Sequence, residues 1–239
     1  SSVTEGEEMV RECSEAGIEL VINYPRRFDH DFRSLESRIG ELLGDVQSIN
    51  LQFKRELLRN GTHMIDEVVY LLEEDVSQLS GFLTGSEELS ESIAEGDVDD
   101  QGGGALLQTE EGTFVTVDCT VSREIWSGYV RLLGTEGKLV IDEGEDEWRY
   151  WSFDGEDHVE ANLPEAFQGG ETPDLDAAFP AAAGHAVDLL NGDATNHSPG
   201  SEAVHVVEIL TGIFTSSYTG SHLSLPLERP LRDVSVRSW

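Results

Sequence analysis

Two side chains three residues apart carry the clearest acid–base chemistry in the sequence. His63 and Asp66 lie at the start of a predicted helix from about Thr62 to Glu74. The unperturbed pKa of imidazole lies near neutrality, and a position at a helix N-terminus favours the neutral form, which accepts protons. Asp66 shares a helix face with His63 and is placed to orient the imidazole. The same spacing also fits a packing role for His63 and a favourable interaction of Asp66 with the helix dipole.

The other cysteine and histidine residues form no disulfide or metal-binding pattern. Cys13 and Cys119 fall in a helix-like and a strand-like run without a CxxC spacing, so we predict two free, buried thiols. His185, His197 and His205 show no repeated spacing to carboxylates, so we predict no metal site.

The composition is strongly acidic. The 239 residues carry 48 acidic and 15 basic side chains, a formal net charge of -33, and only Lys54 and Lys138 are lysines. Aromatic and β-branched residues recur in periodic runs, which argues against disorder. Repulsion among carboxylates destabilises a compact state in dilute buffer, but at 1 M salt it is screened over about 3 Å. We therefore predict a protein of an extreme halophile; an ordinary acidic protein is the alternative.

The charge and the lack of long apolar runs limit the class of partner. A field this negative disfavours nucleic acid and anionic membranes as partners. The N-terminal residues Ser1–Glu5 lack the charged and then apolar pattern of a signal peptide, and no run approaches the ~20 apolar residues of a membrane span. We therefore expect a cytoplasmic protein without nucleic-acid or membrane partners.

The elements that must position the candidate base follow from the apolar periodicity. Residues 6–16 predict a helix, and Ile18–Ile22 predict a strand, which together form an αβ unit. A helix from Phe32 to Leu43 and a long strand from Val46 to Leu58 come next. The helix that carries His63 follows that strand directly.

The second half of the chain predicts short strands followed by helices. Turn-forming residues separate the apolar runs, which predicts an antiparallel meander. Two helices, at about 173–191 and 200–219, precede a last short strand at His222–Leu225. The meander strands are predicted at Leu106–Gln108, Thr113–Thr120, Ser127–Leu133, Lys138–Ile141 and Trp148–Phe153. This order predicts an α+β fold in which helices pack on one face of a mostly antiparallel, open-faced sheet.

Four segments match, in chain order, the motifs of a known family. Glu7–Phe28 is a helix and strand that end in Arg-Arg-Phe, and Asn60–Asp66 has the pattern Gly-x-His-x-x-Asp. Gly134–Leu139 is a sheet turn, and Ile213–Pro226 is a last helix and closing strand. Together these segments resemble the C-terminal, substrate-binding part of the Gfo/Idh/MocA oxidoreductases.

The resemblance implies a division of the chain. Residues 1–25 correspond to a remnant αβ unit of a Rossmann nucleotide-binding domain, and residues 26–239 to the C-terminal α+β domain. The family's Gly-rich turn and Glu-Lys-Pro motif have no counterpart in this sequence. We therefore expect that the chain is part of a longer parent protein that uses NAD or NADP. Alone, the chain is expected to bind neither cofactor and to be inactive.

The resemblance also implies a reaction and the residues that carry it. In the family, a hydride passes between a sugar or polyol carbon and nicotinamide, while a protein base takes the hydroxyl proton. His63 corresponds to that base and Asp66 to its partner. The implied substrate-binding residues are Tyr24, Arg27, Arg59 and Asn60. For Arg27, an ion pair with an acidic neighbour is an equal alternative.

Arg59 departs from the family pattern. Many members have an aspartate four residues before the histidine, and arginine cannot accept a proton. Its planar fork suits a substrate carboxylate or phosphate, or it marks a relative without dehydrogenase activity. Two functions therefore stay open: an NAD(P)-dependent oxidoreductase of a sugar, inositol or sugar derivative, and a non-catalytic relative that binds a sugar-like ligand or a protein. The open sheet face is expected to form a homo-oligomer.

Overall fold

The structure of the protein, a computed structural model, describes residues 2–54, 56–84, 102–121, 128–143, 145, 147–153, 155–163 and 175–235. The α-helices are α1 (Val3–Glu15), α2 (His30–Glu36), α3 (Ile39–Leu43), α4 (Gly61–Leu72), α6 (Leu175–Asn191) and α7 (Gly200–Thr219). Two 3-10 helices are η1 (Pro25–Phe28) and η3 (Leu231–Asp233). The strands are β1 (Val46–Lys54), β2 (Val76–Leu83), β3 (Gly103–Thr109), β4 (Phe114–Val121), β5 (Gly128–Gly134), β6 (Gly137–Asp142), β7 (Glu147–Phe153), β8 (His158–Ala161) and β9 (Leu223–Ser224).

These strands join in one sheet in the order β8-β7-β6-β5-β1-β4-β3-β2-β9. The central strand β1 pairs in parallel with β4 and antiparallel with β5. The remaining neighbours pair antiparallel. The prediction of a mostly antiparallel sheet is therefore confirmed.

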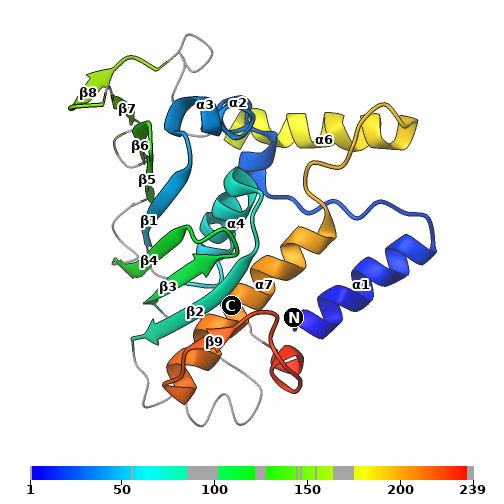
Figure 1. The fold of residues 1–239 in the computed structure, drawn as a ribbon. Helices are drawn as coiled ribbons and strands as arrows, with labels where there is room; N and C mark the ends of the chain where they lie inside the picture. The colour runs from blue at the N-terminus through cyan, green and yellow to red at the C-terminus, as the bar shows by residue number, and fades with distance from the viewer. Residues whose placement is uncertain are drawn as a thin grey trace.

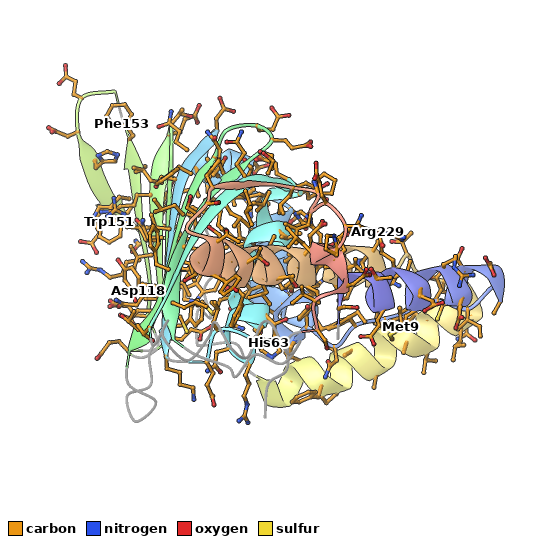
Figure 2. All side chains as sticks on the ribbon, turned by 90° about the horizontal axis from the view of Figure 1, so that it is seen from below. Met9, His63, Asp118, Trp151, Phe153 and Arg229 are labelled. Carbon is orange, nitrogen blue, oxygen red and sulfur yellow. The ribbon has the colours of Figure 1, made fainter. Side chains whose placement is uncertain are left out.

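Helices α4 and α7 cover one face of the sheet (Figure 1). Along β1, Ile49, Leu51 and Phe53 are buried in the core, whereas Asn50 and Gln52 alternate with them and face the other way. Figure 2 shows the sheet edge-on, with these helices on one side and Trp151 and Asp118 on the other. The α+β class and the placement of helices on one face are confirmed.

The N-terminal segment differs from the predicted αβ unit. Helix α1 is present, begins with a capping box between Ser2 and Glu5, and packs beside α7. The strand predicted at Ile18–Ile22 is wrong, because the segment makes only an isolated bridge from Val21 to Pro199. An apolar run forms a strand only beside a partner strand, and this one has none among the described residues. The division of the chain at residue 25 stays a prediction.

Three further element boundaries were predicted incorrectly or missed. The helix predicted from Phe32 to Leu43 is split into α2 and α3. The long strand stops at Lys54, and the chain turns at Glu56 with a φ of 93°. Strands β2 and β8 were not predicted as separate elements. The first residues of two predicted elements, 127 and 173–174, lie outside the described residues.

Gly61 allows α4 to begin directly against β1. A Cβ atom at this position would lie 3.2 Å from the ring of Phe53 and from the side chain of Leu57. Glycine therefore lets the first turn of α4 approach the sheet closely. That approach fixes the place of His63, the third residue of the helix.

Candidate active site at the start of helix α4

His63 is half-buried in the first turn of α4 and contacts Tyr24 from the segment before η1. The two rings meet edge to face, with centroids 5.9 Å apart and an interplanar angle of 88°. Tyr24 is itself held by a hydrogen bond of 3.2 Å between its hydroxyl and Thr62 Oγ1. Burial raises the pKa of Tyr24 to about 12, so the phenol stays neutral. These contacts orient the imidazole without a charged partner.

The surroundings of His63 favour its neutral form. Burial lowers the pKa of His63 below its ordinary value, and the nearby Arg26 guanidinium lowers it further. The helix N-terminus acts in the same direction, because its partial positive charge disfavours a second cation. A neutral imidazole at neutral pH can accept a proton, which is the property a general base needs.

A buried group of charges lies beside this histidine: Arg26, Glu67 and Glu143. Arg26 Nε donates to Glu143 Oε1 at 3.0 Å, and Arg26 Nη2 contacts the same oxygen. Arg26 Nε also lies 3.3 Å from Glu67 Oε2. The exposed fractions of the three side chains are 14%, 0% and 4% in the order Arg26, Glu67, Glu143. One guanidinium is therefore shared by two buried carboxyl groups.

Glu67 is the less well compensated of the two acids. Among the described residues, neither of its carboxyl oxygens has a hydrogen-bond partner, because the contact with Arg26 lacks hydrogen-bond geometry. Burial raises the pKa of Glu67 to about 8, against the lowering effect of Arg26. The acid is therefore protonated at neutral pH. Glu143 fits against Gly128, where no Cβ atom would have room.

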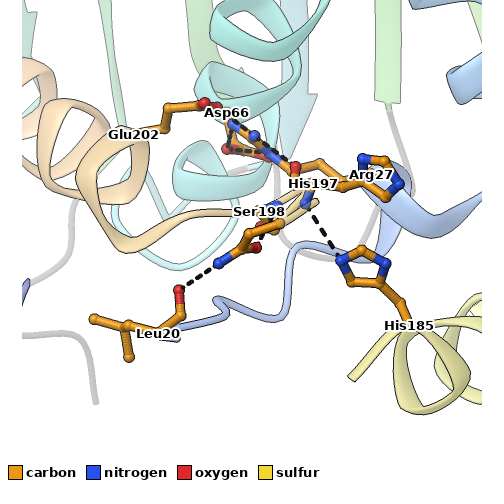
Figure 3. Close-up of polar contacts among 8 residues, drawn as sticks. Leu20, Arg27, Asp66, His185, His197, Ser198 and Glu202 are labelled. Atoms are coloured by element: carbon orange, nitrogen blue, oxygen red, sulfur yellow. Dashed lines mark hydrogen bonds and ion pairs between the residues drawn. The ribbon is translucent and has the colours of Figure 1, made fainter. Parts of the chain in front are cut away.

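A second buried cluster joins η1, α4 and α7 through Arg27 (Figure 3). Its Nη2 lies 2.7 Å from Asp66 Oδ1, and its Nε lies 3.0 Å from both Asp66 oxygens. Arg27 Nη1 donates to the main-chain oxygen of His197 at 3.1 Å and contacts Glu202. The guanidinium also lies over the ring of Tyr70, 5.0 Å from its centroid.

This cluster changes the roles expected for two residues. The orienting contact predicted between Asp66 and His63 is not formed, because Arg27 takes both oxygens of Asp66. Arg27 itself is only 1% exposed. The alternative foreseen for it, an ion pair with acidic neighbours, is the arrangement present. The geometry therefore gives Asp66 and Arg27 structural roles that hold α4 in place.

Arg59 and Asn60 lie in the turn that leads into α4, at the same end of the helix as His63. Arg59 is exposed. Asn60 donates from Nδ2 to the main-chain oxygen of Lys54 at 3.4 Å and does not cap the helix through its side chain. Their contact with a substrate stays a prediction.

Two stacked histidines fix helix α6 beside η1. The rings of His185 and His197 lie 4.5 Å apart at an interplanar angle of 24°. His185 Nε2 accepts from the main-chain N–H of His197 at 3.3 Å, and His197 Nε2 accepts from Arg33 Nη2 at 3.3 Å. Both acceptor nitrogens must be unprotonated for these bonds to form. Burial, followed by the charge of Arg33, lowers the pKa of each ring.

A cavity of about 680 Å³ lies away from His63, around the C-terminal half of α4. Its lining includes Arg27, Arg33, Tyr70, His197 and Glu202, and acidic and basic groups are mixed along it. It therefore presents no uniform charge toward a ligand.

The described residues do not form a metal or dinucleotide site. Among them, no group of three or more His, Cys, Asp or Glu side chains could hold a metal ion. The sequence has no Gly-rich turn of the kind that cradles pyrophosphate between a strand and a helix. Within the same described part of the chain, no helix is long and apolar enough to cross a bilayer.

Glu67 and Glu143 were not predicted as part of the site. Glu67 had a detectable signal, because it lies four residues after His63 on a helix whose adjacent positions, Val68 and Val69, are apolar. Acidic residues on an apolar stretch of helix are unusual. Glu143 carried no such signal, since it follows a strand in an acidic turn.

The fold and the site define a class of protein, namely an open-faced α+β domain with a neutral histidine at the start of a helix. Residues 56–225 match the family described as the Gfo/Idh/MocA oxidoreductase family, C-terminal alpha/beta domain. The match covers well over half of the chain, which therefore belongs to this oxidoreductase family. No curated protein matches the sequence significantly.

Solved structures share the fold at low sequence identity. The WlbA dehydrogenase from Bordetella pertussis, in complex with NADH and UDP-GlcNAcA, has a TM-score of 0.74 at 16% identity, over 95% of this chain and 70% of its own. An oxidoreductase domain protein from Kribbella flavida gives 0.76 at 14%, over 95% and 72%. An oxidoreductase from Agrobacterium radiobacter with NAD+, L-tartaric acid and magnesium gives 0.71 at 14%, over 94% and 70%. These likenesses establish the fold alone.

Proposed function

We propose that the chain is the substrate-binding and oligomerisation part of an NAD(P)-dependent oxidoreductase that acts on a sugar, inositol or sugar derivative by hydride transfer. The observation that carries this proposal is His63, held neutral in the first turn of α4 and oriented by Tyr24. In such a reaction the nicotinamide exchanges a hydride with a substrate carbon. The role of this chain is to transfer the hydroxyl proton, which His63 accepts during oxidation and returns during reduction.

The residues next to His63 suggest what the substrate carries. Arg59 is exposed at the same helix end and presents a fork suited to a carboxylate or phosphate. The solved relatives that hold UDP-GlcNAcA and L-tartaric acid bind ligands with acidic groups, which supports a sugar derivative of this kind. Asn60 is proposed to contact a hydroxyl, while the cofactor is held by residues of the parent protein beyond this chain.

Arg59 also favours a second candidate function, a relative that binds a sugar-like ligand without turnover. Arginine replaces the acid expected four residues before His63, so one hydrogen-bond acceptor for the reacting hydroxyl is missing. Turnover distinguishes the two functions. Only the oxidoreductase converts its substrate, and only it can lose that activity when the imidazole is removed.

The uncovered face of the sheet supports self-association. Phe82, Leu106 and Phe114 lie on the neighbouring strands β2, β3 and β4 and are 62%, 42% and 44% exposed. Large apolar side chains gathered on one face are typical of an interface. We propose that this face joins copies of the chain in a homo-oligomer, in a salt-rich cytoplasm to which the acidic composition is suited.

The test is cofactor reduction by the parent protein in multimolar KCl with sugars, inositols and sugar acids. His63→Ala is expected to lower kcat by at least ~100-fold, the usual effect of losing a general base. His30→Ala, which removes an exposed histidine at the start of α2, is the matched control and keeps its activity. Full turnover in His63→Ala would refute the assignment. Ligand binding without turnover by the unaltered protein would favour the second candidate.

A further inference from the structure

Glu67 is a buried acid that the assignments above do not use. Its side chain is 0% exposed, and it lies one helical turn after His63 in α4. The adjacent residues Val68 and Val69 are apolar core residues. A carboxyl group is seldom buried in such a setting unless a partner compensates it.

The available compensation is insufficient for a second negative charge. Arg26 comes from η1 and is the cation in contact with Glu67, but its Nε and Nη2 donate to Glu143, which follows β6. Asp66, the neighbouring acid on α4, has its own partner in Arg27. One guanidinium facing two carboxyl groups leaves one negative charge in excess. The excess is removed most readily at Glu67, whose oxygens have no hydrogen-bond partner within the described part of the chain.

The helix places this acid on the side of His63. Residues four apart on a helix are neighbours on one face, and side chains lean toward the helix N-terminus, so Glu67 leans over the turn of His63. Both residues interact with the same guanidinium, that of Arg26, and with Glu143. The charged groups that act on Glu67 are therefore Arg26 on η1, Glu143 after β6 and Asp66 on α4, and His63 lies one turn before it on the same helix.

We propose that Glu67 is held as a neutral carboxylic acid and exchanges its proton with His63 through one water molecule. During oxidation of an alcohol, the hydroxyl proton moves to one ring nitrogen of His63. The proton on the other ring nitrogen moves to the Glu67 carboxylate and forms the acid. In reduction each proton moves the opposite way. The imidazole is neutral before and after the transfer, and Glu67 is left as a carboxylate that faces Arg26.

The relay has two parts: the proton exchange between Glu67 and His63, here the proton half, and the use of that exchange during turnover, here the catalytic half. Only the catalytic half rests on the proposed function. Glu67 acts through His63 and is therefore a positioning residue. Its carboxylate form accepts protons, so the relay assists oxidation above the pKa of Glu67, which burial raises to about 8. Below that pH, the acid form assists reduction.

The proton half is tested on the chain itself, without turnover. Infrared spectra recorded against pH are expected to show a protonated carboxyl band near neutral pH that vanishes in Glu67→Gln. Histidine NMR is expected to show a second step in the His63 signals at the pH where that band disappears. Glu208→Gln is the matched control. It removes another buried glutamate, on α7, whose pKa is lowered by the nearby His205 ring and by a hydrogen bond from the Leu227 main-chain N–H, and it should leave both signals intact.

The catalytic half is tested on the parent protein by the pH profile of alcohol oxidation. Glu67→Gln should remove the rise in kcat near pH 8 and lower kcat by about tenfold, less than the ~100-fold expected for losing the base. The value of KM should hold within about twofold, because Glu67 does not touch the substrate. An ionised Glu67 at pH 7, or a one-step His63 titration in the unaltered chain, would overturn the relay. A parent protein with both spectroscopic signals but no turnover would refute the proposed function and the catalytic use of the relay, while the proton exchange would stand.

Discussion

Arg27 and Asp66 form an ion pair in which two arginine nitrogens contact the carboxylate. Nη2 lies 2.7 Å and Nε lies 3.0 Å from Asp66 Oδ1. The pair connects η1 to α4, and Glu202 extends it to α7. The aspartate of the Gly-x-His-x-x-Asp pattern therefore holds the helix that carries His63 and does not touch the imidazole. The position of His63 therefore depends on this pair.

Asp66→Asn should destabilise the protein strongly. The substitution leaves the Arg27 charge buried with only part of its compensation, a change that typically costs about 3–5 kcal/mol. Urea unfolding should therefore show a lower midpoint. Glu15→Gln, which removes an exposed partner of Arg11 on α1, should leave the midpoint nearly unchanged. Equal midpoints for Asp66→Asn and the unaltered chain would contradict the structural role.

Glu67 should make the protein less stable as the pH rises. Its pKa is about 8 in the folded chain against an ordinary 4.5, so between these values the folded state holds one more proton than the unfolded state. The free energy of unfolding should then fall by up to about 1.4 kcal/mol per pH unit. Glu67→Gln cannot ionise and should flatten this slope. Unfolding curves at pH 5, 6.5 and 8 measure it, and parallel slopes in both proteins would contradict a raised pKa.

Acid should loosen helix α6. His185 and His197 have lowered pKa values, so just below 6.5 the unfolded segment binds more protons than the folded one, and stability is lost as the pH falls. Hydrogen exchange, corrected for its intrinsic pH dependence, should show reduced protection of residues 175–191 relative to α7 at pH 5. His185→Gln keeps an acceptor without a titrating ring and should reduce this loss, leaving the contribution of His197. Constant relative protection in the unaltered chain would exclude the effect.

Salt should stabilise the fold well beyond ordinary concentrations. A net charge of -33 repels itself over about 10 Å at 0.1 M salt but over only about 3 Å at 1 M. The thermal midpoint should rise steadily from 0.1 to 2 M KCl. An uncharged osmolyte at matched osmolality is the control and should raise it less. A midpoint that is flat with KCl would argue against adaptation to high salt.

The exposed sheet face should control oligomeric state. Leu106→Glu places a charge among the apolar residues of β3 and its neighbours and should dissociate the oligomer in sedimentation velocity. Val187→Asp changes a more exposed apolar residue on α6 and should leave the assembly intact. If only the α6 variant dissociates the oligomer, the interface does not lie on the exposed sheet face.

The elements could be predicted because their signals are local. The alternation in β1 and the helical spacing after Gly61 lie within short windows of sequence, and the α+β class follows from their order. The strand expected at Ile18–Ile22 failed because a strand needs a neighbour, which no local window can show.

The charge clusters could not be predicted, because their members are distant in sequence. Arg26, Glu67 and Glu143 come from η1, α4 and the end of β6, and only the folded chain brings them together. The same holds for Arg27 and Asp66, where spacing suggested a histidine partner and the fold supplied an arginine. Residue type identified His63, but its electrostatic surroundings depend on tertiary contacts.

The place of β1 in the sheet has a consequence for how the chain folds during synthesis. β1 ends at Lys54, but its two neighbours, β4 and β5, are complete only at Val121 and Gly134. The apolar residues Ile49, Leu51 and Phe53 must therefore wait for partners made much later, and such long-range pairing is slow. β1 is the first strand to be translated, but it can be paired on both sides only after Gly134 has left the ribosome, and the core closes later still, when α7 packs against the sheet.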